Sequence, residues 1–305
     1  MHHLKEIKMV DWSDAQYNGK ALKIAAGVQI SESINYTADR GLTVVTGNCP
    51  TVGVAGGYIQ GGGHSPLSSK YGLAADQTLE FEVIDGQGKY LVANRQENPD
   101  LYWALSGGGG GTYSVVLSVT IKTYPDIKTT MATLQLASSD VPEESYWDAI
   151  ASWNALLPNL YDAGCSAMWG WTREGMRVYP LTCPGASTAD VEALLSPYLT
   201  HLDELKIIHT HQIDFFDKYS EWYTATWSMM EEAQAGITQG GSWFIPESVV
   251  NDEPSNRAFI DAGKKIVDAG AILFFLGFKP SLSTGVDNAV FPGWRNLAID
   301  CIVAS

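Results

Sequence analysis

Glycine is unevenly distributed along this 305-residue chain, and its clusters constrain the fold more than any other feature. Seven glycines lie between Gly47 and Gly63, and five more form the run Gly107–Gly111. Such density is typical of backbone that adopts positive φ or approaches a ligand closely. The clusters are interleaved with Val, Tyr, Ile and Leu rather than with Ser and Gln, which argues against a flexible linker. They indicate a ligand-binding backbone in the first part of the chain.

Composition and charge exclude several classes of protein. Hydrophobic residues make up 45% of the chain and charged residues 17%, which is typical of a globular protein. The 19 basic and 34 acidic side chains give a net charge of −15, which excludes nucleic acid as the main partner. The longest apolar run, Ala271–Phe278, is far shorter than the roughly 20 residues that cross a bilayer, so we expect no membrane span.

The four cysteines, Cys49, Cys165, Cys183 and Cys301, are too widely spaced for a zinc ribbon or a disulfide framework. Whether Cys165 and Cys183 form a disulfide stays open. The polar N-terminus has no apolar signal-peptide stretch, and localisation also stays open.

The first 125 residues are predicted to form short strands with few helices. Alternating residues predict strands over 22–26, 42–45 and 115–122 and a hairpin of Thr78–Ile84 with Lys89–Val92, which turns at Asp85-Gly86-Gln87-Gly88. Helices are expected over 31–40, with Ser31 as N-cap, and over 98–105.

After Asp126 glycine becomes rarer and amphipathic helices are expected over 140–157, 188–205, 215–233 and 255–269. Strands are expected over 130–136, 166–179, 241–246 and 271–279. We therefore place a domain boundary near Asp126 and predict the α+β class, with an antiparallel sheet backed by helices in the second part.

The segment Gly47–His64 presents bare backbone N–H groups that suit a large, flat, phosphorylated ligand. It contains neither a P-loop nor a G-x-G-x-x-G between a strand and a helix, so a Rossmann domain fits poorly. Cys49 is either a buried small hydrophobe or a reactive thiol, and His64 either faces the ligand or is structural. His209, His211 and Asp214 are too common a combination to predict a metal site, and we expect none.

Two blocks of sequence resemble the FAD-binding domain of berberine-bridge-enzyme-like oxidoreductases. The first runs from Cys49-Pro50-Thr51-Val52-Gly53 through Gly61–Gly63 to Tyr71–Asp76, and the second runs from Asp100–Gly107 into Gly108–Val116. These enzymes belong to the vanillyl-alcohol-oxidase (PCMH-type) superfamily, and the chain looks most like its fungal FAD-linked oxidoreductases. The resemblance implies FAD as cofactor, bound by Cys49, Thr51, Val52, Gly53, Gly56, Gly57, Gly61, Gly62, Gly63, His64, Leu73, Ala74, Asp76, Gly111 and Val115.

In that family the cysteine matching Cys49 forms a thioether to C6 of the flavin, and a histidine in an upstream Gly-His motif forms a second bond. Neither His2 nor His3 stands in that context, and the family's C-terminal Tyr-x-Asn block is not found. The resemblance therefore implies truncation at both ends. Residues 1–125 form an FAD-binding domain without its first subdomain, and 126–305 form a substrate-binding domain without its C-terminal part. We expect this chain to bind FAD weakly.

The implied reaction is hydride transfer from a small organic molecule of secondary metabolism to FAD, with O2 as reoxidant. The catalytic base, the substrate and the oligomeric state stay open, and secretion is expected if the full-length chain has a signal peptide. A carbohydrate oxidase of the same superfamily and an inactive truncated gene product are the alternatives.

The substrate is expected against a sheet containing Ser166–Tyr179, Gly241–Pro246 and Ala271–Lys279, where an apolar pocket suits an alkaloid- or polyketide-like molecule. Strand alternation allows only every second residue to face it, and we predict that Trp169 and Trp171 do so. Other aromatic candidates, for which core packing is the alternative, are Trp222, Tyr223, Trp227 and Trp243.

Overall fold

The fold is taken from a computed structural model, which describes residues 1–139, 141–229, 240–280 and 286–304, with side chains in the last helical turn before Met229 left out. The chain forms two compact units. Unit 1 comprises Met1–Ile127, Lys218–Trp227 and Pro280–Pro292, and unit 2 comprises Lys128–Asp217, Ser228–Lys279 and Gly293–Ser305. The sequence suggested a single boundary near Asp126, whereas two later segments also belong to unit 1.

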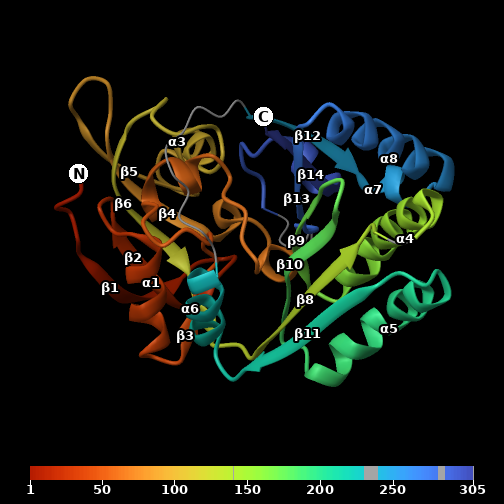
Figure 1. The fold of residues 1–305 in the computed structure, drawn as a ribbon. Helices are drawn as coiled ribbons and strands as arrows, with labels where there is room; N and C mark the ends of the chain where they lie inside the picture. Colours follow the sequence, from red (N-terminus) through yellow and green to blue (C-terminus); the bar gives the residue numbers. More distant parts are fainter. Residues whose placement is uncertain (140, 230–239, 281–285, 305) are drawn as a thin grey trace. The chain divides into compact units, whose positions relative to one another are not determined.

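Unit 1 contains a five-stranded antiparallel sheet in the order β1-β2-β6-β4-β5 (Figure 1). Its strands are β1 (Ile7–Ser13), β2 (Asn18–Ala25), β4 (Thr78–Ile84), β5 (Tyr90–Asn94) and β6 (Val115–Lys122). The alternation in β4 buries Leu79, Phe81 and Val83 on one face, as the sequence pattern predicted. At the turn into β5, Asp85 Oδ1 accepts bonds from the backbone N–H groups of Gln87 and Lys89, each at 2.9 Å.

The helices of unit 1 are α1 (Ile30–Ala38), α2 (Ser68–Tyr71), α3 (Pro99–Leu105) and α6 (Tyr219–Met229), and β3 (Leu42–Thr43) pairs with β7 (Tyr124–Pro125). The N-cap of α1 is Gln29 rather than Ser31, because Glu32 Oε2 accepts a bond from the Gln29 backbone N–H at 2.7 Å. The helix expected over 215–233 begins only at Tyr219, since Phe215 and Phe216 end a strand; residues 230–233 lie outside the described residues.

Unit 2 contains a seven-stranded antiparallel sheet in the order β11-β8-β10-β9-β13-β14-β12. Its strands are β8 (Thr129–Ala137), β9 (Ser166–Trp171), β10 (Gly175–Pro184), β11 (His209–Phe216), β12 (Gly240–Pro246), β13 (Ile272–Gly277) and β14 (Leu297–Ala304). The run expected as one strand over 166–179 forms two, because the chain turns after Trp171 and the Thr172 N–H donates to the Gly175 carbonyl at 2.9 Å. Strands β1, β7, β11 and β14 were not predicted from the sequence.

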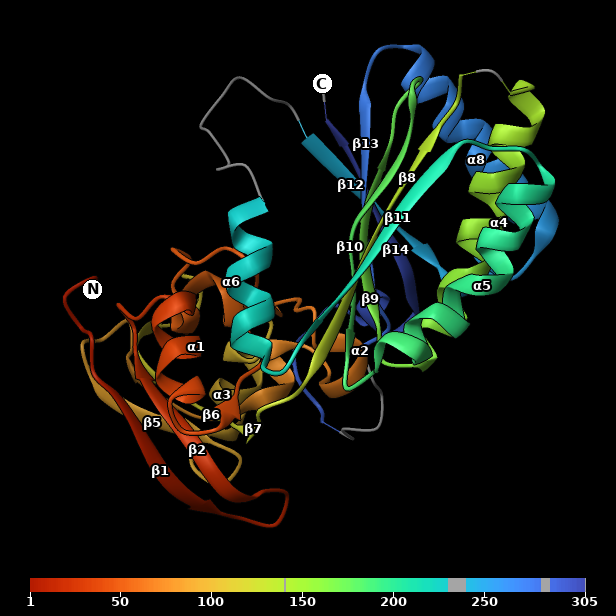
Figure 2. The same cartoon turned by 60° about the horizontal axis from the view of Figure 1, so that its bottom comes forward.

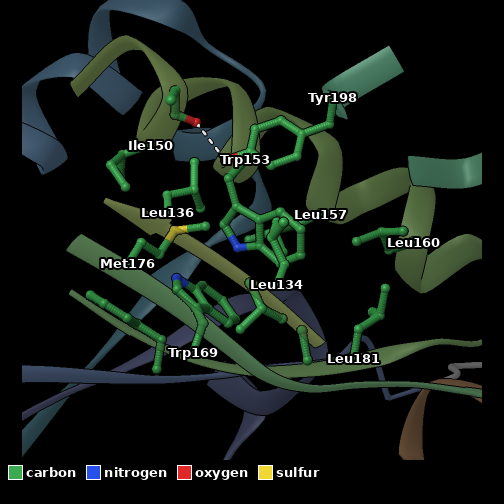
Figure 3. Packing of buried hydrophobic residues seen from close by; sticks show 14 of the residues in the cluster. Leu134, Leu136, Ile150, Trp153, Leu157, Leu160, Trp169, Met176, Leu181 and Tyr198 are labelled. Carbon is green, nitrogen blue, oxygen red and sulfur yellow. Dashed lines mark hydrogen bonds between the residues drawn. The ribbon is translucent and has the colours of Figure 1, made fainter. Parts of the chain in front are cut away.

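Helices α4 (Glu143–Asp162), α5 (Thr188–Glu204) and α8 (Glu253–Asp268) cover one face of this sheet, and the short α7 (Glu247–Val250) precedes α8 (Figure 2). Trp153 of α4 packs between Tyr198 of α5 and Trp169 of β9, with ring centroids 5.5 and 6.1 Å away (Figure 3). A disulfide joins Cys165 and Cys183 inside this core. The opposite surface of the sheet is called the helix-free face below.

The predicted α+β class, with antiparallel sheets and covering helices, is confirmed. Among the residues that the structure describes, no helix combines the length and apolar character needed to span a membrane.

Candidate functional site

The two glycine blocks meet in unit 1 around a cavity of about 450 Å³. The Gly109 N–H donates to the Gln60 carbonyl at 2.7 Å, and a Cβ added to Gly110 would lie 2.8 Å from Gly57 Cα. Close approach of the two backbones therefore requires glycine at this point. The cavity is lined by Met1, Ala26, Gly56, Gly57, Gln60, Ile84, Asp85, Gly86, Gly111, Thr112, Tyr113, Ser114, Val115 and Val116.

Four of the lining glycines have open space where a side chain would begin: Gly86 in the turn between β4 and β5, and three in the glycine blocks. A Cβ added to Gly56, Gly57 or Gly111 would meet no other atom within 4 Å. These positions thus leave bare backbone facing open space, and Gly111 also adopts a φ of +71°. Backbone without side chains beside a cavity lets a large cofactor approach closely, so the residues present fit FAD.

Cys49 is a free, exposed thiol at a turn that is fixed to the start of α1. The backbone N–H groups of Ile30 and Ser31 donate to the carbonyls of Val52 and Pro50 at 3.0 and 3.2 Å. The Gln29 side chain donates to the Thr51 carbonyl at 3.0 Å. These bonds use N–H groups that the first helical turn leaves without partners, and they keep the thiol at the surface. Gly53 continues the segment through a single bridge to Gln29.

Helix α6 supplies two tyrosines to unit 1, one helical turn apart. Tyr219 is fully buried beside Ser65, and Tyr223 is 6% exposed beside Cys49. Burial raises the pKa of Tyr223, and the neighbouring Cys49 raises it further. The phenol therefore stays protonated and takes part in hydrogen bonds as a neutral hydroxyl. Its hydroxyl has no hydrogen-bond partner among the described residues. Sequence analysis named Tyr223 only as a general aromatic candidate.

Several residues expected to bind the cofactor form a buried wall and do not line this cavity. Leu73, Ala74 and Asp76 are buried, with exposures of 1%, 0% and 0%. The Asp76 carboxylate accepts bonds from the Leu73 N–H at 2.8 Å and from the Asn288 side chain at 2.7 Å.

The triple glycine lies against this wall and leads into His64. A Cβ on Gly63 would lie 2.8 Å from that of Ala74, while Gly61 is exposed and Gly62 buried. Burial lowers the pKa of His64, which therefore stays neutral, and the His64 carbonyl accepts a bond from the Tyr58 hydroxyl at 2.8 Å. Within the described chain, the predicted residues that line the cavity are Gly56, Gly57, Gly111 and Val115.

In unit 2 the prediction for Trp169 and Trp171 is wrong. Both are buried, at 1% and 0% exposure, on the side of the sheet that the helices cover. Trp171 contacts Trp147 of α4 and Phe259 of α8, with ring centroids 6.3 and 5.7 Å away. Alternation in β9 then directs Ser166, Met168 and Gly170 to the helix-free face. Of the other candidates, Trp222 is buried, Trp243 is 76% exposed, and the Trp227 side chain lies outside the described residues.

Asp300 is an acidic residue of the helix-free face that the sequence analysis missed. Its strand neighbours Ile299 and Cys301 pack into the helix-side core, and Phe244 of β12 and Leu276 of β13 flank it in register. Asp300 is only 7% exposed, and its Oδ1 has no hydrogen-bond partner among the described residues. Burial raises the pKa of this carboxyl, which opposes a smaller effect of the Ser242 hydroxyl. The sequence signal that could have identified Asp300 is a single acidic residue within the otherwise apolar run 297–303.

His209 and His211 lie on β11 with their rings 6.0 Å apart, and the carboxylate of Asp214 accepts bonds from the Gln212 side chain. No group of three or more metal-ligating side chains is found in the described part of the chain.

Comparison with known proteins identifies the family to which this chain belongs. Residues 2–94 match the model of an FAD binding domain family. The FAD-linked oxidoreductase patO of Aspergillus clavatus is 38% identical over 309 residues, covering 100% of this chain and 53% of the relative. The FAD-linked oxidoreductase sthB of Phaeosphaeria nodorum is 40% identical over 226 residues, covering 74% of this chain and 72% of the relative. The chain thus spans about half the length of patO.

Solved structures of flavoproteins resemble this chain as well. The VAO-type flavoprotein MtVAO615 of Myceliophthora thermophila C1 has a TM-score of 0.91 at 37% identity, over 99% of this chain and 56% of that one. Berberine bridge enzyme from Eschscholzia californica shares the fold, with a TM-score of 0.73 at 19% identity over 100% of this chain and 60% of that one. The chain belongs to the FAD-linked oxidoreductases of the VAO-type flavoproteins, which use FAD as their cofactor.

Proposed function

We propose that this protein oxidises a small organic molecule of secondary metabolism, with FAD as the hydride acceptor and O2 as the reoxidant. The observation that carries the proposal is the cavity edged by Gly56, Gly57 and Gly111, where an added Cβ would meet no atom of the described chain within 4 Å. Relatives support the chemistry, since one is named a VAO-type flavoprotein oxidase and another a bifunctional decalin synthase. When bound, FAD would supply the redox chemistry, and the protein would supply binding, orientation and proton transfer.

The residues that would hold FAD are the cavity-lining glycines and the backbone of 111–114, with Cys49 as the covalent anchor expected from the family resemblance. Cys49 would hold the ring through its sulfur, giving up its thiol hydrogen, with O2 as the oxidant that such a link requires. Tyr223, protonated and beside Cys49, would offer a hydrogen-bond donor there.

We assign acceptance of the substrate proton to Asp300. Loss of hydride from an alcohol or amine carbon is accompanied by loss of a proton from oxygen or nitrogen, so a base is required. A carboxyl that is almost fully buried, with one oxygen unpartnered, has the raised pKa and the free lone pairs that such a base needs. Its flanking residues, Phe244 and Leu276, favour an apolar substrate.

A carbohydrate oxidase is the second candidate, and one observation favours it. A groove of about 320 Å³ on unit 2 is lined mainly by polar groups: Thr133, Gln135, Arg177, Tyr179, Thr210, His211, Gln212 and Asp214, with Leu134. Polar side chains at this density suit the hydroxyls of a sugar.

The test uses protein expressed from the complete gene. We expect a yellow protein whose flavin stays attached after acid precipitation, with a flavin adduct on the Cys49 peptide by mass spectrometry. The Cys49→Ala variant should lose that adduct. Stopped-flow reduction by aromatic or polyketide-like alcohols, compared with mono- and disaccharides, separates the two candidates, and Asp300→Asn should slow reduction by at least about 100-fold, the usual range for a general base. A colourless protein that takes up no added FAD would overturn the proposal.

A further inference from the structure

A short segment, residues 287–291, packs against the two glycine blocks of the candidate FAD site. Residues 287–291 belong to unit 1, although they follow the second glycine block by more than 170 positions in the sequence. The Trp103 indole N–H donates to Asp287 Oδ1 at 3.0 Å, and the Ala289 N–H donates to the Ser106 carbonyl at 3.1 Å. The Asn288 side chain donates to Asp76 Oδ1 at 2.7 Å. Residues 287–291 therefore bind both the helix before the second block and the turn after the first.

Val290 occupies the space that two glycines leave free. A Cβ on Gly107 would lie 2.4 Å from Val290 Cγ2 and 2.9 Å from its Cα, and one on Gly62 would lie 3.8 Å from Cγ2. Val290 itself is 6% exposed. Gly107 has a φ of +108°, so the backbone there also needs glycine. The side chain of Val290 thus lies between the two glycine blocks and touches both.

The same run of glycines faces the cavity a few residues later. Gly107 packs on Val290, whereas Gly110 packs on Gly57 and Gly111 lines the cavity. The position of Gly110 and Gly111 therefore depends on where Val290 holds the start of the run, since only two residues lie between Gly107 and Gly110.

We propose that residues 287–291 are a positioning segment of the FAD site, in which Val290 and Asn288 hold the second glycine block at the separation from the first that FAD requires. The rival explanation is that the segment only adds buried apolar surface and stability. The two explanations differ in what a variant loses, because a stabilising contact affects unfolding whereas a positioning contact also affects the cofactor.

The test compares Val290→Ala with Val178→Ala, a valine at 1% exposure in the core of unit 2. Both variants are made in full-length protein carrying Cys49→Ala and lacking the upstream histidine link that the family resemblance implies, so that no covalent bond retains the flavin. Flavin fluorescence gives the rate of FAD loss, and hydrogen exchange gives the protection of amides 108–114. We expect Val290→Ala to lose FAD at least tenfold faster and to lose protection in 108–114. Val178→Ala should lower the melting temperature by a similar amount and change neither measurement.

Asn288→Ala tests the same idea without removing buried apolar surface and should shift both readouts in the same direction. A second pair of variants separates backbone strain from displacement of the second glycine block. Gly107→Ala adds an atom 2.4 Å from Val290 Cγ2 and should release FAD. Gly88→Ala, at a φ of +81° with no atom within 4 Å of the added Cβ, should not. The proposal is overturned if Val290→Ala and Asn288→Ala retain FAD and amide protection like the parent while melting at lower temperature.

Discussion

Glycines that look equivalent in the sequence have different roles within a single run. A Cβ on Gly108 would lie 2.5 Å from the Ala104 carbonyl oxygen, so packing requires glycine there, whereas one on Gly111 would meet nothing within 4 Å. Clustering could therefore predict that the backbone binds a ligand, but not which member faces it. That assignment depends on Val290 and Gly57, which reach the run from distant parts of the chain.

This distinction predicts that two alanine variants both lose FAD affinity but differ in their effect on stability. Gly110→Ala adds an atom 2.8 Å from Gly57 Cα, so the two backbones must separate, and both FAD affinity and melting temperature should fall. Gly56→Ala adds an atom in open space, so FAD affinity should fall by tenfold or more while the melting temperature of the apoprotein stays within about 2 °C of the parent. FAD titration and thermal unfolding of the apoproteins check both, and equal losses of stability would contradict the distinction.

Asp300 predicts a stability change that depends on pH. Its pKa is raised in the folded state, so the folded protein binds the proton more tightly than the unfolded chain does. Stability from this group is complete below the ordinary pKa of 3.8 and is lost as pH rises towards the folded-state pKa. Asp300→Asn should therefore melt higher than the parent at neutral pH, by an amount that shrinks on acidification to pH 4. An advantage that grows on acidification would show that the carboxyl is stabilised by ionisation.

Strands and helices were predictable where local pattern and local contacts coincide. The β4–β5 hairpin follows the alternation of β4, because one face of that strand lies against a core, whereas β6 buries four residues in a row, Ser118–Ile121. The edge strand β1 is only partly buried along its length, so its sequence carries a weaker pattern. For β9 the pattern gave two sets of residues but not the face that receives the helices, which depends on residues such as Trp153 in α4.

The corrected orientation of β9 predicts that its tryptophans serve stability alone. Trp169 is 1% exposed and stacks on Phe275 with ring centroids 5.2 Å apart. Trp169→Ala should cost about 3–5 kcal/mol in the free energy of unfolding, the usual range for a large buried aromatic. Urea unfolding measures that loss, and FAD affinity, measured by titration below the transition, should not change. Trp169→Phe serves as the control that keeps most of the packing.

At the scale of the whole molecule, neither unit is a continuous stretch of chain. The polypeptide passes from one unit to the other after Ile127, Asp217, Trp227, Lys279 and Pro292. The change in composition near Asp126 marked the first of these passages. The later ones left no compositional signal, because α6 and residues 287–291 are short segments whose membership depends on contacts such as Tyr219 N–H with Asp126 and Asn288 with Asp76.

A fragment of residues 1–127 should therefore not behave as an independent domain. It lacks α6, whose Tyr219 and Trp222 are buried at 0% and 1% exposure, and the apolar surface that they cover would face water. We expect the fragment to aggregate or to unfold without a cooperative transition, and to bind no FAD, while the 305-residue chain unfolds cooperatively. Size-exclusion chromatography and circular dichroism check this, and a monomeric fragment with a sharp melt would contradict it.

Because unit 1 consists of separated segments, it cannot be completed until late in synthesis of the chain. Unit 1 receives its last segment only when Pro292 has left the ribosome, long after Ile127. At about 5–20 residues per second, translation of the intervening stretch takes on the order of ten to thirty seconds. Throughout that interval the nascent glycine blocks lack Val290, and until Met229 has been made unit 1 also lacks α6. An unfinished unit 1 therefore exposes apolar surface to water for that time, and we expect a chaperone to bind the nascent chain until residues 287–291 emerge.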